Sequence, residues 1–220
     1  LSSNISKSID TPFGDISSEL ISGSISNIPI VVLSRHGLNH SISPTNVNYR
    51  ANIWALKEEG CSHIFAITAC GSLREKIAPG HFIFPNQFID RTTKRISTFF
   101  DGSKVQHISM GSPFSKHLRK CLVKACKSLS FHCHDGGTVV TIEGPRFSTK
   151  AESMMFRSWG CDIINMSTVP EIILARELNL EYQSIAMSTD YDCWRDNEEE
   201  VTMEMIYSVM EKNVKNVKKL

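Results

Sequence analysis

Short apolar runs alternate with amphipathic stretches along most of the chain. Runs rich in Ile, Val, Phe and Thr, bounded by Gly, Pro, Asn or Ser, predict extended segments at 19–25, 28–34, 63–69, 81–89, 104–109, 137–142, 162–166 and 182–189. Apolar residues at helical spacing predict helices over 46–59, about 114–129, 148–159, about 170–178 and 199–219. The serine-rich stretch 1–18 predicts a loose start.

This alternation of strands and helices predicts the fold class. It is typical of an α/β protein with a central mixed β-sheet flanked by helices on both faces. The chain has 220 residues, of which 41% are hydrophobic, and this is enough for a single domain over residues 1–220. Ligands of such folds bind beyond the carboxyl ends of the strands, so the strand ends carry the candidate chemistry.

Charge and hydropathy indicate what kind of molecule the protein binds. The chain has 24 basic and 23 acidic side chains and a net charge of +1, so no overall field attracts nucleic acid or an anionic membrane. The longest apolar runs, such as residues 28–33, are too short to span a bilayer, and the first residues lack a signal-peptide pattern. We expect a cytoplasmic protein that binds a small molecule, with no nucleic acid and no membrane as partner.

The seven cysteines are an odd number and form no C-x-x-C pair, which favours reduced thiols. Cys126 with H-C-H-D at 132–135 has the composition of a metal site. Neighbours on one strand point to opposite faces, however, so they cannot all reach one ion. We therefore favour a solvated segment before a strand and expect no metal.

Three predicted strand ends carry groups that can bind an anion. The first closes on Arg35 and His36, and the second places the small residues Thr68 and Ala69 before Gly71. The third delivers Asn165, Met166 and Ser167 after an apolar run. Each has an ordinary alternative, which is a surface pair, a tight turn and a helix N-cap respectively.

Two further stretches suggest recognition of a planar ligand. In T-I-E-G-P-R-F-S, residues 141–148, a Gly-Pro turn precedes Phe147, which can stack on a flat ring or simply pack in the core. In S-T-D-Y-D an apolar strand ends on Asp190 and Asp192. In extended backbone these two carboxyls face one side, and Tyr191 faces the other. The alternative is a pair of solvated acids capping a helix.

Two neighbouring carboxyls can act as an acid and an acceptor. Burial and a second carboxylate both raise a carboxyl pKa, so one of the pair can stay protonated and donate a proton. The other can accept a hydrogen bond from a donor group of the ligand.

Seven motifs together resemble the methylthioadenosine phosphorylase family of the purine nucleoside phosphorylases. They are R-H-G-L-N-H, N-Y-R-A-N-I-W-A-L-K-E-E-G, T-A-C-G-S-L-R, Q-F-I-D-R-T, T-I-E-G-P-R-F-S, I-N-M-S-T-V-P-E and S-T-D-Y-D-C-W. They run in order from about Asp10 to about Glu200. Related phosphorylases select 6-oxopurines with a Glu and an Asn, whereas this chain has Asp190 and Asp192.

The resemblance implies the nucleoside phosphorylase fold and phosphorolysis of S-methyl-5′-thioadenosine to adenine and 5-methylthioribose 1-phosphate, in purine and methionine salvage. It implies a homotrimer, no cofactor and no metal, with inorganic phosphate as co-substrate.

It also implies a role for each matching residue. Phosphate should meet Arg35, His36, Thr68, Ala69 and Ser167. The nucleoside should meet Phe147, Ser148, Asn165, Met166, Asp190, Asp192, Met203 and Ile206. Asp190 should be the catalytic acid at purine N7, and Asp192 should accept from the exocyclic amine. His107 should reach in from a neighbouring subunit.

The chain departs from the family pattern in three places. The family begins with a strand and a Gly-Gly-Thr-Gly phosphate loop, and this chain opens downstream of both. It also stops before the family's C-terminal segment, so the 5′ end of the substrate is less well specified. Ser167 stands where the family often has Thr, which keeps the hydroxyl.

Three alternative functions stay open from sequence. One is a phosphorylase of broader 6-aminopurine nucleosides, including adenosine. Another is a hydrolytic nucleosidase, against which Arg35-His36 argues. The last is a binding or scaffold protein without catalysis.

Overall fold

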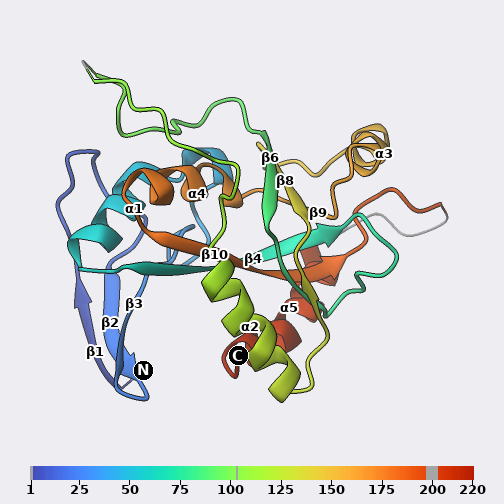
Figure 1. Cartoon of the computed structure of the whole chain (residues 1–220), viewed down its shortest axis with the longest axis horizontal. Coiled ribbons are helices and arrows are strands. Elements are labelled where there is room, and N and C mark those ends of the chain that lie inside the picture. The colour runs from blue at the N-terminus through green and yellow to red at the C-terminus, as the bar shows by residue number, and fades with distance from the viewer. Residues whose placement is uncertain (1, 103, 197–202) are drawn as a thin grey trace.

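A computed structural model of the chain describes the backbone of residues 2–102, 104–196 and 203–220 (Figure 1). The strands are β1 Ser2–Lys7, β2 Leu20–Ile25, β3 Ile28–Val32, β4 His63–Ser72, β5 Phe82–Phe84, β6 Gln87–Arg91, β7 Cys133–Asp135, β8 Thr138–Ile142, β9 Ile163–Asn165 and β10 Glu181–Asp190. The helices are η1 Pro44–Asn46, α1 Tyr49–Glu58, α2 Lys116–Ser128, α3 Lys150–Ser158, α4 Thr168–Glu177 and α5 Met203–Val217.

Seven strands form the central sheet, in the order β6-β8-β9-β4-β10-β5-β7. The pairs β6–β8, β8–β9, β4–β10 and β5–β7 are parallel, whereas β4–β9 and β5–β10 are antiparallel. The longest pairing joins β4 and β10, which run together across the molecule (Figure 1). The predicted mixed sheet is therefore confirmed.

Helices cover both faces of this sheet, as the alternating pattern predicted. β10 shows the division, because Tyr182 and Ala186 pack in one apolar cluster with α1 and α4, while Ile185 and Met187 pack in another with α2. A third cluster lies where Phe156 of α3 meets Val140 and Ile164. Within the described residues, every helix is too short or too polar to cross a bilayer.

The first three strands form a separate antiparallel sheet, β1-β2-β3, which projects from the main body (Figure 1). The prediction of a loose stretch over 1–18 is wrong for residues 2–7, because β1 pairs with β2. Serine is a weak strand former, and tertiary pairing overrides that preference here. β3 carries the chain from this sheet towards Arg35 and His36.

Two other strand predictions are wrong. The run 81–89 is two strands, β5 and β6, which belong to different positions in the sheet. Pro85 lies between them and has no N–H to donate to a ladder. Residues 104–109 form no strand and are largely exposed, with Val105 75% exposed.

Candidate functional site

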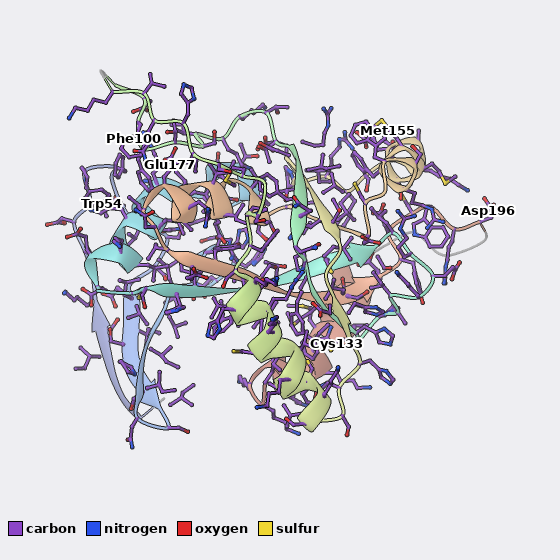
Figure 2. All side chains as sticks on the ribbon, viewed as in Figure 1. Trp54, Phe100, Cys133, Met155, Glu177 and Asp196 are labelled. Carbon is purple, nitrogen blue, oxygen red and sulfur yellow. The ribbon has the colours of Figure 1, made fainter. Side chains whose placement is uncertain are left out.

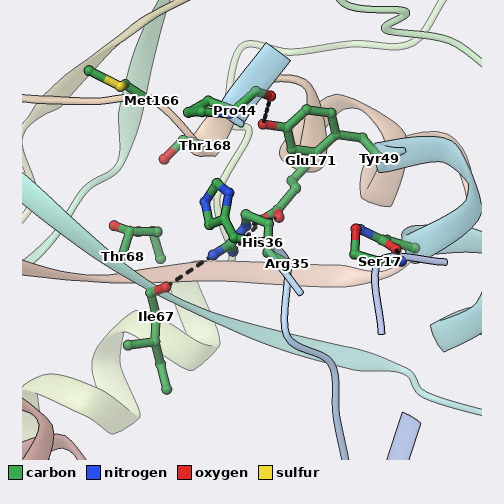
Figure 3. Close-up of polar contacts among 12 residues, drawn as sticks. Ser17, Arg35, His36, Pro44, Tyr49, Ile67, Thr68, Met166, Thr168 and Glu171 are labelled. Carbon is green, nitrogen blue, oxygen red and sulfur yellow. Dashed lines mark hydrogen bonds and ion pairs between the residues drawn. The ribbon is translucent and has the colours of Figure 1, made fainter. Parts of the chain in front are cut away.

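Arg35 follows β3 and is held in place by a buried acid. Its Nε and Nη2 atoms donate to the two carboxylate oxygens of Glu171 on α4, and Nη1 donates to the carbonyl of Ile67 on β4 at 3.3 Å (Figure 3). The hydroxyl of Tyr182 donates to the same carboxylate at 2.9 Å. Burial alone would lower the pKa of Arg35, but the charge and hydrogen bond of Glu171 outweigh it and raise that pKa. Arg35 is thus a permanent cation beside β4.

His36 lies next to this cation. Burial lowers its pKa, and the charge of Arg35 lowers it further, against the effect of the bond to Ile42. Its Nδ1 atom lies 2.8 Å from the carbonyl of Ile42, so Nδ1 donates to that carbonyl. A neutral ring in this tautomer can accept a hydrogen bond from a ligand at Nε2.

Thr68 and Asn165 belong to one buried polar network. Asn165 Nδ2 donates to Thr168 Oγ1 at 2.8 Å and to Thr68 Oγ1 at 3.5 Å, and Asn165 Oδ1 accepts from Thr141 at 3.0 Å. The amide of Asn165 therefore joins β8, β9, β4 and the start of α4. These hydrogen bonds hold the buried amide of Asn165 in a fixed orientation.

Ser167 and Ala69 flank this network. Ser167 is the N-cap residue of α4, as the alternative reading suggested, but its side chain makes no capping hydrogen bond. Its hydroxyl remains available at the N-terminal end of the helix. Ala69 is half-buried on β4 directly after Thr68.

The Gly-Pro turn after β8 packs closely on Met166. A Cβ built on Gly144 would lie 2.5 Å from Met166 Sδ, and Gly144 has φ +70°, so only glycine fits there. Phe147 follows this turn and is 40% exposed. Core packing of Phe147, which the sequence left open, is therefore excluded, and its ring is free to meet a ligand.

Asp190, Asp192 and Ser148 form a second cluster at the end of β10. The Ser148 hydroxyl donates to both oxygens of Asp192, at 2.8 and 3.0 Å. A Cβ built on Gly71 would lie 3.0 Å from Asp190 Oδ1 and 3.3 Å from Asp192 Cβ. Both acids therefore lie over the same glycine, which has to be small.

The expected extended backbone through both acids is wrong. β10 ends at Asp190, and Asp192 has φ +53°, the left-handed region. The carboxylate of Asp190 accepts from the N–H of Asp192 at 2.7 Å, which closes a turn. The acids come together through this turn rather than through strand alternation.

Burial raises the pKa of Asp190, and the negative charge of Asp192 adds to this effect. Two hydrogen bonds oppose the rise, from the Asp192 N–H and from the Thr189 hydroxyl, which donates at 2.6 Å. The net direction is upward. Asp190 therefore binds its proton more tightly than an ordinary aspartate does.

The structure describes only in part the residues predicted to contact the 5′ end of the substrate or a neighbouring subunit. Met203 and Ile206 lie on α5, but their side chains are outside the described residues. His107 is exposed in the segment 104–109, where no strand forms. This exposed position leaves it accessible to another molecule.

The H-C-H-D segment forms a short strand, β7, that sequence analysis missed. Cys133 packs with Phe82 and Cys126, while His134 Nε2 lies 3.0 Å from His81 Nδ1. The two side chains thus point to opposite faces. Among the described residues, no group of three or more His, Cys, Asp or Glu side chains could hold a metal ion.

Sequence reasoning missed the residues that hold the site together, which are Glu171, Tyr182 and Arg95. Glu171 stands inside a strongly apolar helical segment, and a lone acid in such a position signals a buried partner. Tyr182 begins an apolar strand and gave no polar signal. Arg95 lies in a polar segment without periodicity.

Comparison with known proteins shows the family to which the chain belongs. A family model described as the phosphorylase superfamily matches residues 2–220. The chain belongs to this superfamily. It is 55% identical over 219 residues to an S-methyl-5′-thioadenosine phosphorylase of Xenopus tropicalis, covering 97% of this chain and 78% of that protein. It is 56% identical over 208 residues to the one of Danio rerio, covering 92% and 74%.

Solved structures give the same result for the superfamily fold. A methylthioadenosine phosphorylase of Schistosoma mansoni in complex with adenine matches with a TM-score of 0.94 and 43% identity, over 97% of this chain and 81% of that chain. A point mutant of the adenosine/methylthioadenosine phosphorylase of the same organism, bound to methylthioadenosine, matches with a TM-score of 0.92 and 42% identity over the same shares.

Breaking the buried pair of Arg35 and Glu171 should destabilise the fold. Its side chains are only 17% and 8% exposed, so Glu171→Gln leaves a buried cation without its counter-charge. We expect a loss of about 3–5 kcal/mol in the free energy of unfolding, measured by urea denaturation. The matched control Tyr182→Phe removes one hydroxyl and keeps the ion pair, with an expected loss of about 1 kcal/mol. Equal losses in the two variants would contradict this assignment.

Proposed function

We propose that this protein catalyses the phosphorolysis of S-methyl-5′-thioadenosine to adenine and 5-methylthioribose 1-phosphate, a step of purine and methionine salvage. The observation that carries the proposal is the spacing of two groups along β4. Arg35 reaches the carbonyl of Ile67, and Asp190 lies over Gly71. Four strand residues span about 13 Å, which suits phosphate at one end of a nucleoside and a purine at the other.

The purine end supplies a proton. Breaking the bond between N9 and the anomeric carbon leaves electron density on the base, and transfer of the Asp190 proton to N7 neutralises it. The buried, raised-pKa carboxyl of Asp190 suits this donor. Asp192, oriented by Ser148, accepts from the 6-amino group, and Phe147 stacks beside the base.

The phosphate end supplies the nucleophile. Arg35 is fixed by Glu171, and it holds the dianion together with His36, Thr68, Ala69 and Ser167. One phosphate oxygen forms the new bond to the anomeric carbon while the bond to N9 breaks. The negative charge of phosphate also stabilises the oxocarbenium-like sugar. Met166 packs against the Gly144 turn, and the ribose is proposed to bind beside it.

The reaction as proposed uses no cofactor and no metal, only phosphate as co-substrate. We further propose a cytoplasmic protein, which the seven free cysteines support. We propose a homotrimer in which His107 reaches the pocket of a neighbouring subunit, supported by its exposed position. Met203 and Ile206 on α5 are proposed to line the methylthio group.

A broader specificity is the second candidate. A solved relative bears the name adenosine/methylthioadenosine phosphorylase, so adenosine could also be a substrate of this chain. The kcat/KM values for methylthioadenosine and adenosine separate the two. A preference of less than about tenfold would favour the broader activity.

Adenine release should require phosphate. We expect purified protein to release adenine from methylthioadenosine only when phosphate is present, with 5-methylthioribose 1-phosphate as the second product. Arg35→Ala should raise the KM for phosphate because a charge-assisted bond to the anion is lost. The control is Arg119→Ala, since Arg119 is also 17% exposed and also pairs with an acid, Asp135. Equal turnover without phosphate, giving free methylthioribose, would refute phosphorolysis.

Changing Asp190 or Asp192 to Asn should affect the reaction in different ways. Asp190→Asn cannot transfer a proton, so kcat should fall by about 10²–10⁴ while nucleoside binding changes less. Asp192→Asn offers a donor as well as an acceptor, so kcat/KM should shift towards methylthioinosine. If Asp192→Asn keeps the wild-type ratio and Asp190→Asn alters it, the two roles should be exchanged.

The pH dependence follows from the same pair. The folded pKa of Asp190 is raised, so its proton is present at low pH and is lost as pH rises through that pKa. We expect kcat to fall on this alkaline limb. Asp192→Asn removes a neighbouring negative charge, which lowers the pKa of Asp190 and should move the limb to lower pH. A limb unmoved by this substitution would assign it to another group.

Subunit sharing can be tested by complementation. Mixing His107→Ala and Asp190→Ala chains should restore part of the activity, because some hybrid pockets contain both intact residues. Subunit exchange is verified by mass spectrometry of the assembled oligomer. No recovery after verified exchange would show that His107 serves no neighbouring pocket.

A further inference from the structure

Arg95 is a fully buried cation outside any helix or strand. Its side chain is 0% exposed, and it lies in the segment between β6 and α2. Removing a charged group from water is costly unless all its donors are satisfied. The position of Arg95 therefore has to be explained by what the guanidinium binds.

All three nitrogens of the guanidinium are used. Nη1 donates to the carbonyls of Met166 at 2.7 Å and Val169 at 2.6 Å, and to the hydroxyl of Tyr49 at 3.0 Å. Nη2 donates to the carbonyls of Ile142 at 3.3 Å and Glu143 at 2.7 Å. Nε donates to the Glu143 carboxylate at 3.2 Å.

These carbonyls belong to the two segments that frame the proposed ribose position. Ile142 ends β8, Glu143 follows it just before the Gly144 turn, and Met166 and Val169 flank the start of α4. Glu143 and Met166 lie outside any helix or strand. The planar fork of one arginine holds both at a fixed spacing, which the point charge of a lysine cannot do.

Glu143 keeps Arg95 in this position. Its carboxylate accepts from the N–H groups of Thr93 at 2.5 Å and Lys94 at 3.0 Å, and from the Thr45 hydroxyl at 2.7 Å. Burial would raise the pKa of Glu143, but these donors and Arg95 lower it to about 2. The counter-charge is thus present at any working pH.

A second acid fixes the same segment further along. Glu177, which is buried on α4, accepts from the Thr98 hydroxyl and the Phe99 N–H, both at 2.7 Å. Figure 2 shows Glu177 beside Phe100 at this edge of the molecule. The segment is therefore held near both ends, and Arg95 extends from it towards Met166 and Glu143.

We propose that Arg95 is a positioning residue that sets the distance between Met166 and the turn bearing Phe147 and Ser148, and so shapes the nucleoside half of the pocket. The proposed phosphate cation, Arg35, is held instead by Glu171. This inference rests on the proposed function. Arg95 touches neither ligand, and it is proposed to influence the affinity for the nucleoside rather than the affinity for phosphate.

The test is calorimetric binding of methylthioadenosine and, separately, of inorganic phosphate to wild type and Arg95→Lys, with each protein verified as folded at the assay temperature. A misplacement of about 1 Å costs about 10²-fold in turnover. We expect the Kd for methylthioadenosine to rise at least about tenfold, and the Kd for phosphate to change less than about twofold. The matched control is Arg119→Lys, another arginine paired with an acid, which should change neither value.

The outcomes separate this inference from the proposed function. Wild type that binds methylthioadenosine, with Arg95→Lys binding it equally well, overturns the inference alone, as does an equal rise in both Kd values. Wild type that does not bind methylthioadenosine overturns the proposed function and the inference with it. If Arg95→Lys does not fold, Glu143→Gln keeps the carbonyl bonds and weakens the anchor. It should raise the nucleoside Kd selectively by about threefold, and no rise overturns the inference.

Discussion

The parallel pairing of β4 with β10 sets the spacing between the two ends of the proposed site. Its register runs from Glu181 opposite His63 to Asp190 opposite Gly71. A strand pair of this length is stiff, so the positions of Ile67 and Gly71 fix the distance between the cation of Arg35 and the acid of Asp190. Side chains from distant parts of the chain attach at these positions, so the backbone of β4 sets the distance between them.

Two buried ion pairs connect loops to the central sheet, and the two pairs have different roles. Arg35 with Glu171 presents a cation beside β4, and Tyr182 supplies a further donor. Arg95, whose side chain is 0% exposed, instead joins two segments through their carbonyls. Pairs of this kind are poor sources of stability compared with apolar packing, so their presence suits a need for geometry.

The sequence predicted the alternation of strands and helices, the mixed sheet and most strand ends with candidate chemistry. It did so because burial imposes a local period, 2 for strands and 3.6 for helices, that can be read from neighbouring residues. It failed where local and tertiary preferences differ. β1 is serine-rich and yet pairs, β5 and β6 separate at Pro85, and residues 104–109 have strand composition without a partner.

The sequence by itself determined which residue types stand at the strand ends, including the acids at 190 and 192 and the basic pair at 35 and 36. Only the tertiary structure decided how they meet. Asp192 reaches Ser148 through a left-handed turn, and Arg95 reaches two turns that lie 47 and 71 residues away in the chain. Such contacts depend on the path of the whole backbone, which no local pattern of residues encodes.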